Sequence, residues 1–340
     1  MGHTDVPRPV VILVVGSLNM DLVARCPHIP APGETVLGSD FALHPGGKGA
    51  NAATAAARLV AVGERGGAAT TVAMLGAVGR DAHGGALLDN LRRRGVDAAR
   101  VREVDTVPTG VALIAVADDG DNSIVVAPGA NSTLRPADVA PVLAELRPAA
   151  VLMQLEIPLE TVVQAAVGGH AGSIRVLLDP APAPTTIPAE LLAAVDVLLP
   201  NEGELAGLTG LPTGTTEEAT RAARSLRARG PRVVVVKRGA KGALIVDESE
   251  NARAVAAPRV DAIDTTGAGD CFDGALAVAL VEGQPLDAAV AFATRAAALS
   301  CTRIGAQEAQ PTRDEVDGRR ATGDGRRATG DGRWATGDGR

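Results

Sequence analysis

The chain has 340 residues, 46% of them hydrophobic and 1% aromatic, and it carries a net charge of -7. This length is enough for one large α/β domain or two smaller ones. The negative charge and the scarcity of aromatic residues exclude the basic and base-stacking surfaces with which proteins bind nucleic acids. The three cysteines, Cys26, Cys271 and Cys301, have no framework spacing and predict a reducing, cytoplasmic compartment.

An apolar run at Val10–Val15 predicts a first buried strand. The run is too short for a signal peptide or a membrane span, so we expect no membrane association. Asn19 and Asp21 follow it and, being two residues apart, point the same way in an extended chain. An amide and a carboxylate together can bind adjacent sugar hydroxyls. An Asx-rich turn that closes the strand is the alternative, and this pair alone favours it.

A glycine-rich segment, PGGKGAN at residues 45–51, precedes a predicted helix at residues 52–59. It lacks the spacing of a Walker A motif, because Gly49 stands where Ser or Thr should follow Lys48. Its glycines allow the backbone to approach a ligand closely, and Lys48 and Asn51 add a cation and an amide. The alternative is a glycine hinge before a helix.

The next elements suggest a small accessory sheet. Residues 72–78 predict a strand, and residues 82–94 a helix that Asp81 could cap. Residues 109–117 and 123–127 predict two strands joined by a polar turn, and residues 34–43 could join the same sheet. A flap of this kind could close over a sugar and exclude water, which would compete as phosphoryl acceptor.

From residue 149 onward, strands and helices alternate, as in a parallel sheet covered on both faces. Predicted strands lie at residues 151–154, 174–178, 195–199 and 232–236, and predicted helices at 158–167, 217–229, 270–282 and 286–301. Asn201 and Glu204 open a short helix, where they could hold a hydrated Mg²⁺ from its outer shell. An N-cap with an acidic first turn explains the two residues equally well.

The segment DTTGAGD, residues 264–270, lies between a β-like run ending near Ile263 and a long Ala-rich helix. Small residues before a helix leave backbone N–H groups bare, so Gly267, Ala268 and Gly269 predict an anion site. A bound phosphate would repel a carboxylate beside this site, so the presence of Asp270 needs a functional explanation. We predict that Asp270 deprotonates a hydroxyl that attacks a γ-phosphoryl group. The alternative is a Gly-rich turn followed by a helix that Asp270 caps.

Six short segments, taken together and in their order along the chain, resemble those of bacterial ribokinases, in the phosphofructokinase-B group of sugar kinases. The resemblance covers Val10 to about Pro311, and its most specific parts are segments 45–51 and 264–270. The others are segments 16–21, 128–131, 154–156 and 200–204. The resemblance implies a Rossmann-like αβα core with a small β-sheet lid, which often pairs across a homodimer.

We therefore expect a flexible N-terminus at residues 1–9 and a kinase domain at 10–315, with the lid formed by about 30–45 and 108–130. Residues 316–340 contain a repeated GDGR pattern with almost nothing apolar and predict a disordered tail. The tail has no counterpart in the family.

The resemblance also implies a role for each matching residue. Ribose would be held by Asn19, Asp21, Gly47, Lys48, Asn51, Glu156 and Asp270. ATP would be surrounded by Asn201, Lys237, Arg238, Gly239, Ala240, Lys241, Gly242, Gly269 and Thr294. Glu204 would act on Mg²⁺ through water, and K⁺ would be bound by Asp264, Thr266, Ser300, Arg303, Gly305 and Ala309, several of them through backbone carbonyls.

Two features depart from the family pattern. Lys237 and Arg238 stand where smaller or neutral residues are common, and their charge could suit phosphates or alter base choice. Ala309 replaces a frequent serine, so it could contribute to a K⁺ site only through its carbonyl.

The predicted activity is ATP-dependent phosphorylation of D-ribose at its 5-hydroxyl. A kinase of the same group acting on deoxyribose, a nucleoside or fructose is the nearest alternative. A catalytically silent sugar- or nucleotide-binding protein is another. A dinucleotide oxidoreductase is disfavoured, because no G-x-G-x-x-G motif follows the first strand.

Overall fold

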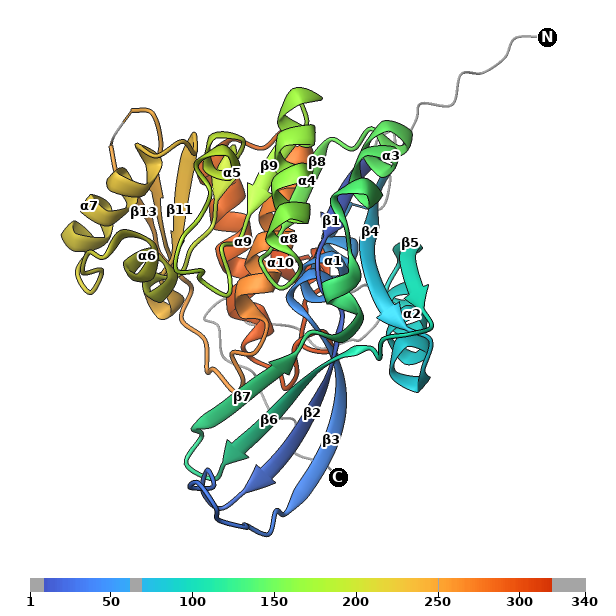
Figure 1. Cartoon of the computed structure of the whole chain (residues 1–340). Helices are drawn as coiled ribbons and strands as arrows, with labels where there is room; N and C mark the ends of the chain where they lie inside the picture. Colours follow the sequence, from blue (N-terminus) through green and yellow to red (C-terminus); the bar gives the residue numbers. More distant parts are fainter. Residues whose placement is uncertain (1–8, 62–68, 250, 320–340) are drawn as a thin grey trace, which may run out of the picture.

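The structure is a computed structural model that describes residues 9–61, 69–249 and 251–319. A nine-stranded sheet lies between two layers of helices, and a four-stranded sheet projects from one end of this core (Figure 1). This arrangement confirms the predicted α/β three-layer class. None of the described helices is long and apolar enough to cross a bilayer.

The large sheet has the strand order β13-β12-β11-β10-β9-β8-β1-β4-β5. All neighbours pair in parallel except β11 with β12 and β12 with β13, which are antiparallel. The bounds are β1 (Val10–Val15), β4 (Thr70–Gly79), β5 (Val96–Val104), β8 (Ala150–Met153), β9 (Arg175–Leu178), β10 (Val197–Leu198), β11 (Val233–Lys237), β12 (Ala243–Val246) and β13 (Arg253–Val255).

The two faces of this sheet bury separate apolar clusters, because successive residues of a strand point to opposite faces. In β1, Ile12 and Val14 pack on one side, and Leu13 and Val15 on the other. The first side is covered by α1 (Lys48–Leu59), α2 (Ala82–Arg93), α8 (Ala268–Val281), α9 (Leu286–Ser300) and α10 (Arg313–Asp317). The second is covered by α3 (Pro136–Leu146), α4 (Leu159–Ala171), α5 (Ala189–Ala193), α6 (Glu202–Thr209) and α7 (Thr216–Arg227).

The small sheet has the order β3-β2-β6-β7. Its strands are β2 (Asn19–Cys26), β3 (Asp40–Gly46), β6 (Gly110–Ala117) and β7 (Asn122–Ala127). The 3₁₀ turn η1 (Gly129–Thr133) leads back to the core. Because only three residues separate β1 from β2, the start of the small sheet lies at the carboxyl edge of the large one.

Several element predictions need correction. The β-like run predicted to end near Ile263 is wrong, because β13 ends at Val255 and residues 256–263 form no strand. Asn19 and Asp21 begin a strand rather than a closing turn, since β2 pairs with both β3 and β6. Strands β5, β12 and β13 were not predicted. Helix α10 runs past residue 315, and residues 1–8 and 320–340 lie outside the described part of the chain.

Candidate active site

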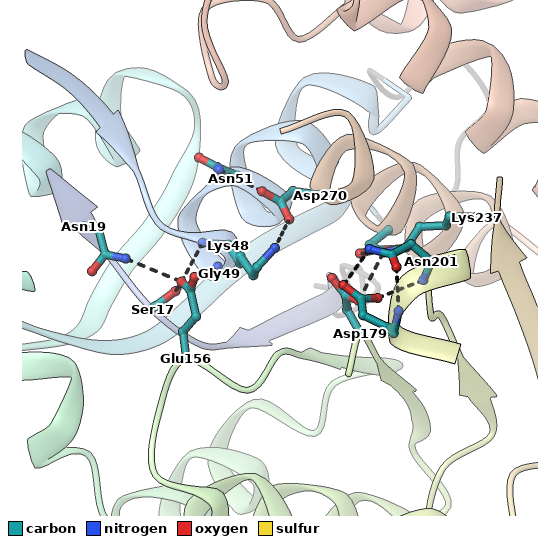
Figure 2. A network of polar contacts seen from close by, with 12 residues as sticks. Ser17, Asn19, Lys48, Gly49, Asn51, Glu156, Asp179, Asn201, Lys237 and Asp270 are labelled. Atoms are coloured by element: carbon teal, nitrogen blue, oxygen red, sulfur yellow. Dashed lines mark hydrogen bonds and ion pairs between the residues drawn. The ribbon is translucent and has the colours of Figure 1, made fainter. Parts of the chain in front are cut away.

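Two groups of polar side chains meet at the carboxyl edge of the large sheet (Figure 2). One surrounds Glu156 and Asp270, and the other surrounds Lys237 and Asp179. The residues come from the ends of β1, β8, β9 and β11 and from the starts of α1 and α8. Ligands bind at this edge in open α/β sheets, and the sequence prediction placed the site there.

Glu156 accepts hydrogen bonds through one carboxylate oxygen from three groups. Its Oε2 accepts from Ser17 Oγ at 2.6 Å, from the Lys48 backbone N–H at 3.2 Å and from Asn19 Nδ2 at 3.4 Å. Asn19, Lys48 and Glu156, all predicted to bind the sugar, therefore do lie together. Ser17 was not predicted, although it stands inside the quoted segment 16–21.

Asn131 is a further residue that the prediction did not assign. Its Nδ2 donates to Asn19 Oδ1 at 2.8 Å, and its Oδ1 accepts from the Leu18 N–H at 2.9 Å. These bonds fix the orientation of the Asn19 amide, because the amide oxygen of Asn19 is occupied and its nitrogen faces Glu156. The segment 128–131 was recognised in the sequence, but no single residue in it carried a role.

Asp21 is held close to the glycine segment. Burial, followed by the charges of Glu156, Asp270 and Glu308, raises the pKa of Asp21 to about 7. A Cβ atom on Gly46 would lie 2.3–2.4 Å from the Asp21 carboxylate. Gly47 has φ 88°, and a Cβ there would lie 2.7 Å from the Asn19 nitrogen. Glycine is therefore required at Gly47 by the backbone and by close approach, whereas a side chain at Gly46 would displace the Asp21 carboxylate.

Asp270 lies in the first turn of α8 and is buried. Asn51 Nδ2 donates to its Oδ2 at 2.8 Å, and Lys48 Nζ lies 4.0 Å from its Oδ1. Burial raises the pKa of Asp270, and the negative charge of Asp270 is the largest cause that raises the pKa of Lys48. The alternative that Asp270 caps this helix is wrong, because Gly267 is the N-cap, with φ 71° and no side-chain cap.

At the start of α8, one of the N–H groups predicted to bind an anion, that of Ala268, is already hydrogen-bonded within the protein. The Ala268 N–H donates to the Thr265 carbonyl at 3.2 Å, and the Cys271 N–H to Gly267 at 2.8 Å. Gly267, Ala268 and Gly269 thus lie at a helix N-terminus, where N–H groups and the helix dipole favour negative charge. Their role as an anion hole stays a prediction.

Lys237 is buried between two carboxylates. Its Nζ lies 3.1 Å from Asp179 Oδ1 and 3.0 Å from Asp273 Oδ2. Burial alone would lower the pKa of Lys237, but the two carboxylates outweigh it and the net shift is upward. Oxygens of Asp179, Asp270 and Asp273 lie within 4.8 Å of one another, a spacing that a cation could bridge. The Lys237 ammonium already pairs with two of the three.

A cavity of about 550 Å³ lies next to this group. Its lining includes predicted nucleotide residues, namely Lys237, Arg238, Gly239, Ala240, Gly242, Gly269 and Thr294, but not Asn201 or Lys241. One wall is formed by residues 257–262, which belong to the β-like run that the sequence predicts to end near Ile263.

The extra positive charges beside this cavity have partners. Arg238 donates from Nε to Glu202 Oε1 and from Nη1 to Thr216 Oγ1, each at 2.9 Å. Lys241 Nζ donates to Glu202 at 3.3 Å and to the Gly214 carbonyl at 3.2 Å. These side chains tie the loop after β11 to α6 and α7, and the two cations share the single Glu202 carboxylate, which offsets one of their two charges.

Asn201 and Glu204 form a capping box at the start of α6. Asn201 donates from its backbone N–H and from Nδ2 to the two Glu204 oxygens, each at 2.8 Å, and accepts from the Glu204 N–H at 2.8 Å. Burial and the charge of Asp179 raise the pKa of Glu204. The capping interpretation is confirmed, and the role of Glu204 toward Mg²⁺ stays a prediction.

The residues predicted to bind K⁺ are brought together only in part. Asp264 accepts from Thr266 N at 2.9 Å, from Thr266 Oγ1 at 2.6 Å and from Gly305 N at 2.9 Å. Burial would raise the pKa of Asp264, but these hydrogen bonds outweigh it and lower the pKa. The side chains of Ser300 and Arg303 bond instead to the Ala297 carbonyl and to Glu315. Ala309 is buried.

A family model described as pfkB family carbohydrate kinase matches residues 11–313. The chain belongs to this family. This pfkB kinase is 42% identical to the ribokinase of Bacillus subtilis (strain 168), over 90% of this chain and 98% of the relative. It is 39% identical to the ribokinase of Haemophilus influenzae, over 89% and 96%. It is also 37% identical to a deoxyribokinase of Salmonella typhi, over 89% and 96%.

Solved structures agree with this assignment. A structure of Arabidopsis thaliana ribokinase complexed with ribose and ATP superimposes with a TM-score of 0.81 at 34% identity, covering 92% of this chain and 98% of that one. The ribokinase of Thermotoga maritima superimposes with a TM-score of 0.80 at 37% identity, covering 91% and 98%. The sequence resemblance to the sugar-kinase group is thereby confirmed over nearly the whole domain.

Proposed function

We propose that this pfkB kinase transfers the γ-phosphoryl group of ATP to the 5-hydroxyl of D-ribose. The observation that carries the proposal is the position of Asp270. Its buried carboxylate contacts Asn51 and Lys48, two of the residues predicted to bind the sugar. The preceding residue, Gly269, lines the cavity. An acceptor alcohol and a nucleotide could therefore meet at this carboxylate. The ribokinase relatives supply the identity of the sugar.

The groups in the site suit each part of an in-line phosphoryl transfer. Asp21 and Glu156 would accept hydrogen bonds from ribose hydroxyls, and the Asn19 amide nitrogen would donate one to a ribose oxygen, with Gly47 allowing close approach. Asp270 would take the proton of the 5-hydroxyl while a bond forms from that oxygen to the γ-phosphorus and the bond to the ADP oxygen breaks. The N–H groups at the start of α8, with Lys48 nearby, would stabilise the charge on the transferring group.

The nucleotide would occupy the cavity, whose lining suits an adenosine and its phosphates. Its wall includes Phe272 and Val260 as well as Gly239, Ala240 and Gly242. Thr294 lies in this lining with its hydroxyl donating to the Val290 carbonyl at 2.8 Å, so it contributes surface rather than a free donor.

The residues present also fit the two expected metal ions. Burial and the charge of Asp179 raise the pKa of Glu204, so a nearby cation would stabilise its ionised form, and Glu204 could hold waters of a nucleotide-bound Mg²⁺. Asp264, held ionised by Thr266 and Gly305, could anchor K⁺ together with backbone carbonyls. Mg²⁺ would neutralise phosphate charge, and K⁺ would add positive potential near the anion site.

We further infer that the small sheet serves as the lid and as the contact of a homodimer. Its strands expose apolar side chains that a single copy leaves uncovered, namely Phe41, Leu43, Leu113, Ile124, Val125 and Val126. Exposed apolar patches of this kind are typical of protein–protein contacts. A cytoplasmic location would suit both substrates and the free cysteines.

ADP formation with a panel of acceptors tests the function. Ribose should give the highest kcat/KM, above deoxyribose, fructose and nucleosides, and a preference for deoxyribose would instead place the chain with the Salmonella relative. Asp270→Asn should lower kcat by about 10²- to 10⁴-fold, because the general base is lost. Near-normal turnover by that variant, with unchanged ribose binding, would remove Asp270 from the proposed role.

A further inference from the structure

A line of three buried amide side chains leads away from Asp270. Asn51 Nδ2 donates to Asp270 Oδ2 at 2.8 Å, Gln307 Nε2 donates to Asn51 Oδ1 at 2.9 Å, and Asn90 Nδ2 donates to Gln307 Oε1 at 2.5 Å. Asn51 and Asn90 are 6% exposed and Gln307 is 0% exposed. The residues come from α1, α2 and the loop before α10, so only the fold brings them together.

This line has a defined direction. An ionised carboxylate only accepts hydrogen bonds, whereas each amide has one donor end and one acceptor end. Because Gln307 occupies the oxygen of Asn51, the Asn51 NH₂ group is the end presented to Asp270. Because Asn90 occupies the oxygen of Gln307, the Gln307 NH₂ group is the end presented to Asn51. Each amide therefore sets the orientation of the next.

We propose that Gln307 is a positioning residue for the base: acting through Asn51, it fixes the side from which the Asp270 carboxylate is held. This inference rests on the proposed role of Asp270. Without Gln307, only the Asp270 carboxylate holds the Asn51 amide, and a turn of that amide, which puts two acceptors face to face, is no longer opposed at its oxygen. Asn51 is also a predicted sugar ligand, so the same turn would exchange the donor that it offers to ribose.

The electrostatic surroundings of Asp270 make this hydrogen bond important. Burial raises the pKa of Asp270, and Asp179 raises it further. Lys48 on α1, the Asn51 hydrogen bond and Lys237 on β11 all lower it. Asp21 on β2 and Asp273 on α8 also interact with this charge. If the Asn51 donor turns away, the pKa of Asp270 should rise, and the base will become protonated at a higher pH.

Gln310 offers a matched control in the same loop. It is equally buried, and its Nε2 also donates to Asn51, at 2.7 Å, but to the backbone carbonyl. That carbonyl accepts from Thr54 Oγ1 as well, at 3.0 Å. Removing Gln310 therefore costs a buried hydrogen bond to the same residue without releasing the Asn51 amide.

The test compares Gln307→Met with Gln310→Met in the full chain. We expect Q307M to lower kcat by at least about tenfold, because the released Asn51 amide no longer keeps its hydrogen bond to the charged Asp270 carboxylate. We also expect its ribose KM to rise, its ATP KM to stay unchanged, and the acidic limb of its kcat–pH profile to move to higher pH. Q310M should lose a similar amount of thermal stability but keep the limb and kcat within about twofold of the parent.

Two outcomes would overturn the proposal. One is an equal fall of kcat in both variants with no movement of the limb, which would make Gln307 a packing residue. The other is a Q307M variant with parental kcat, ribose KM and pH profile. If Q307M does not fold, Asn90→Ala takes its place in the test. N90A should show a smaller fall of kcat and the same shift of the acidic limb. A parental pH profile in N90A would equally overturn the proposal. An active Asp270→Asn variant would instead remove the base itself, so the two failures are distinguishable.

Discussion

The buried group formed by Lys237, Asp179 and Asp273 gives the most direct test of the energetics. Lys237 is 12% exposed in its side chain, and each carboxylate is 2% exposed, so solvent screens these pairs little. Lys237→Met leaves two buried carboxylates without their cation. Breaking a buried pair in this way costs about 3–5 kcal/mol, and we expect this loss in the free energy of unfolding at pH 8.

The loss should shrink at lower pH, because the raised pKa of Asp273 will rise further without Lys237. A group whose folded pKa is raised destabilises the fold while it is ionised, and the fold recovers as pH falls and a proton binds. Starting from the ordinary Asp value of 3.8, neutralising one carboxyl costs about 1.36 kcal/mol per pH unit. Protonating one carboxyl therefore costs about 6 kcal/mol at pH 8, which is more than the expected loss of stability, but about 2 kcal/mol at pH 5.5. Protonation therefore limits the loss of stability only at the lower pH.

Urea denaturation at the two pH values measures this difference. Lys241→Met is the matched control, since Lys241 lies in the turn that follows β11 and pairs with Glu202 but has a side chain that is 54% exposed. It should cost less than about 1 kcal/mol at either pH. Lys237→Met combined with Asp273→Asn should recover part of the loss. A K237M variant within about 1 kcal/mol of the parent at pH 8, or with the same loss at both values, would refute the reasoning.

Three further predictions concern the sugar side and the end of the chain. Because the pKa of Asp21 is raised to about 7, ribose KM should increase as pH falls below that value. Asp21→Asn should remove this pH dependence, and a parental profile in D21N would assign the dependence to another group. Gly46→Ala places a Cβ 2.3 Å from Asp21 Oδ2, so ribose KM should rise at least about tenfold while ATP KM does not change, and equal effects on both would contradict the steric reason. Deletion of residues 320–340 should leave kcat and the melting temperature unchanged, because the family match ends at residue 313 and α10 at Asp317; a large loss of either would show that the tail contributes.

Local signals predicted much of the core. The run Val10–Val15 is a strand with those bounds, and the long Ala-rich runs near the C-terminus are α8 and α9 with ends within two residues of those predicted. Strong apolar periodicity over a whole element makes such predictions possible. Strand β2 failed because its start carries Asn19 and Asp21, which are typical turn residues, and only pairing with β3 and β6 makes this segment a strand. At such positions, pairing with neighbouring strands outweighs the local preference of Asn and Asp for turns.

In the candidate site, too, local motifs could be predicted, whereas residues brought together only by the fold could not. Residues within short motifs, such as Lys48, Asn51 and Asp270, could be found because each motif lies in one continuous segment. Asp179 and Asp273 were not predicted, although Asp179 directly follows β9 and Asp273 follows Asp270 by three residues on α8. That spacing places the side chains of Asp270 and Asp273 on one helix face. Their meaning depends on Lys237, which comes from a third segment. An odd lysine in a nucleotide loop suggests phosphate binding when read alone, and its two buried acidic partners show instead that its charge is first used within the protein.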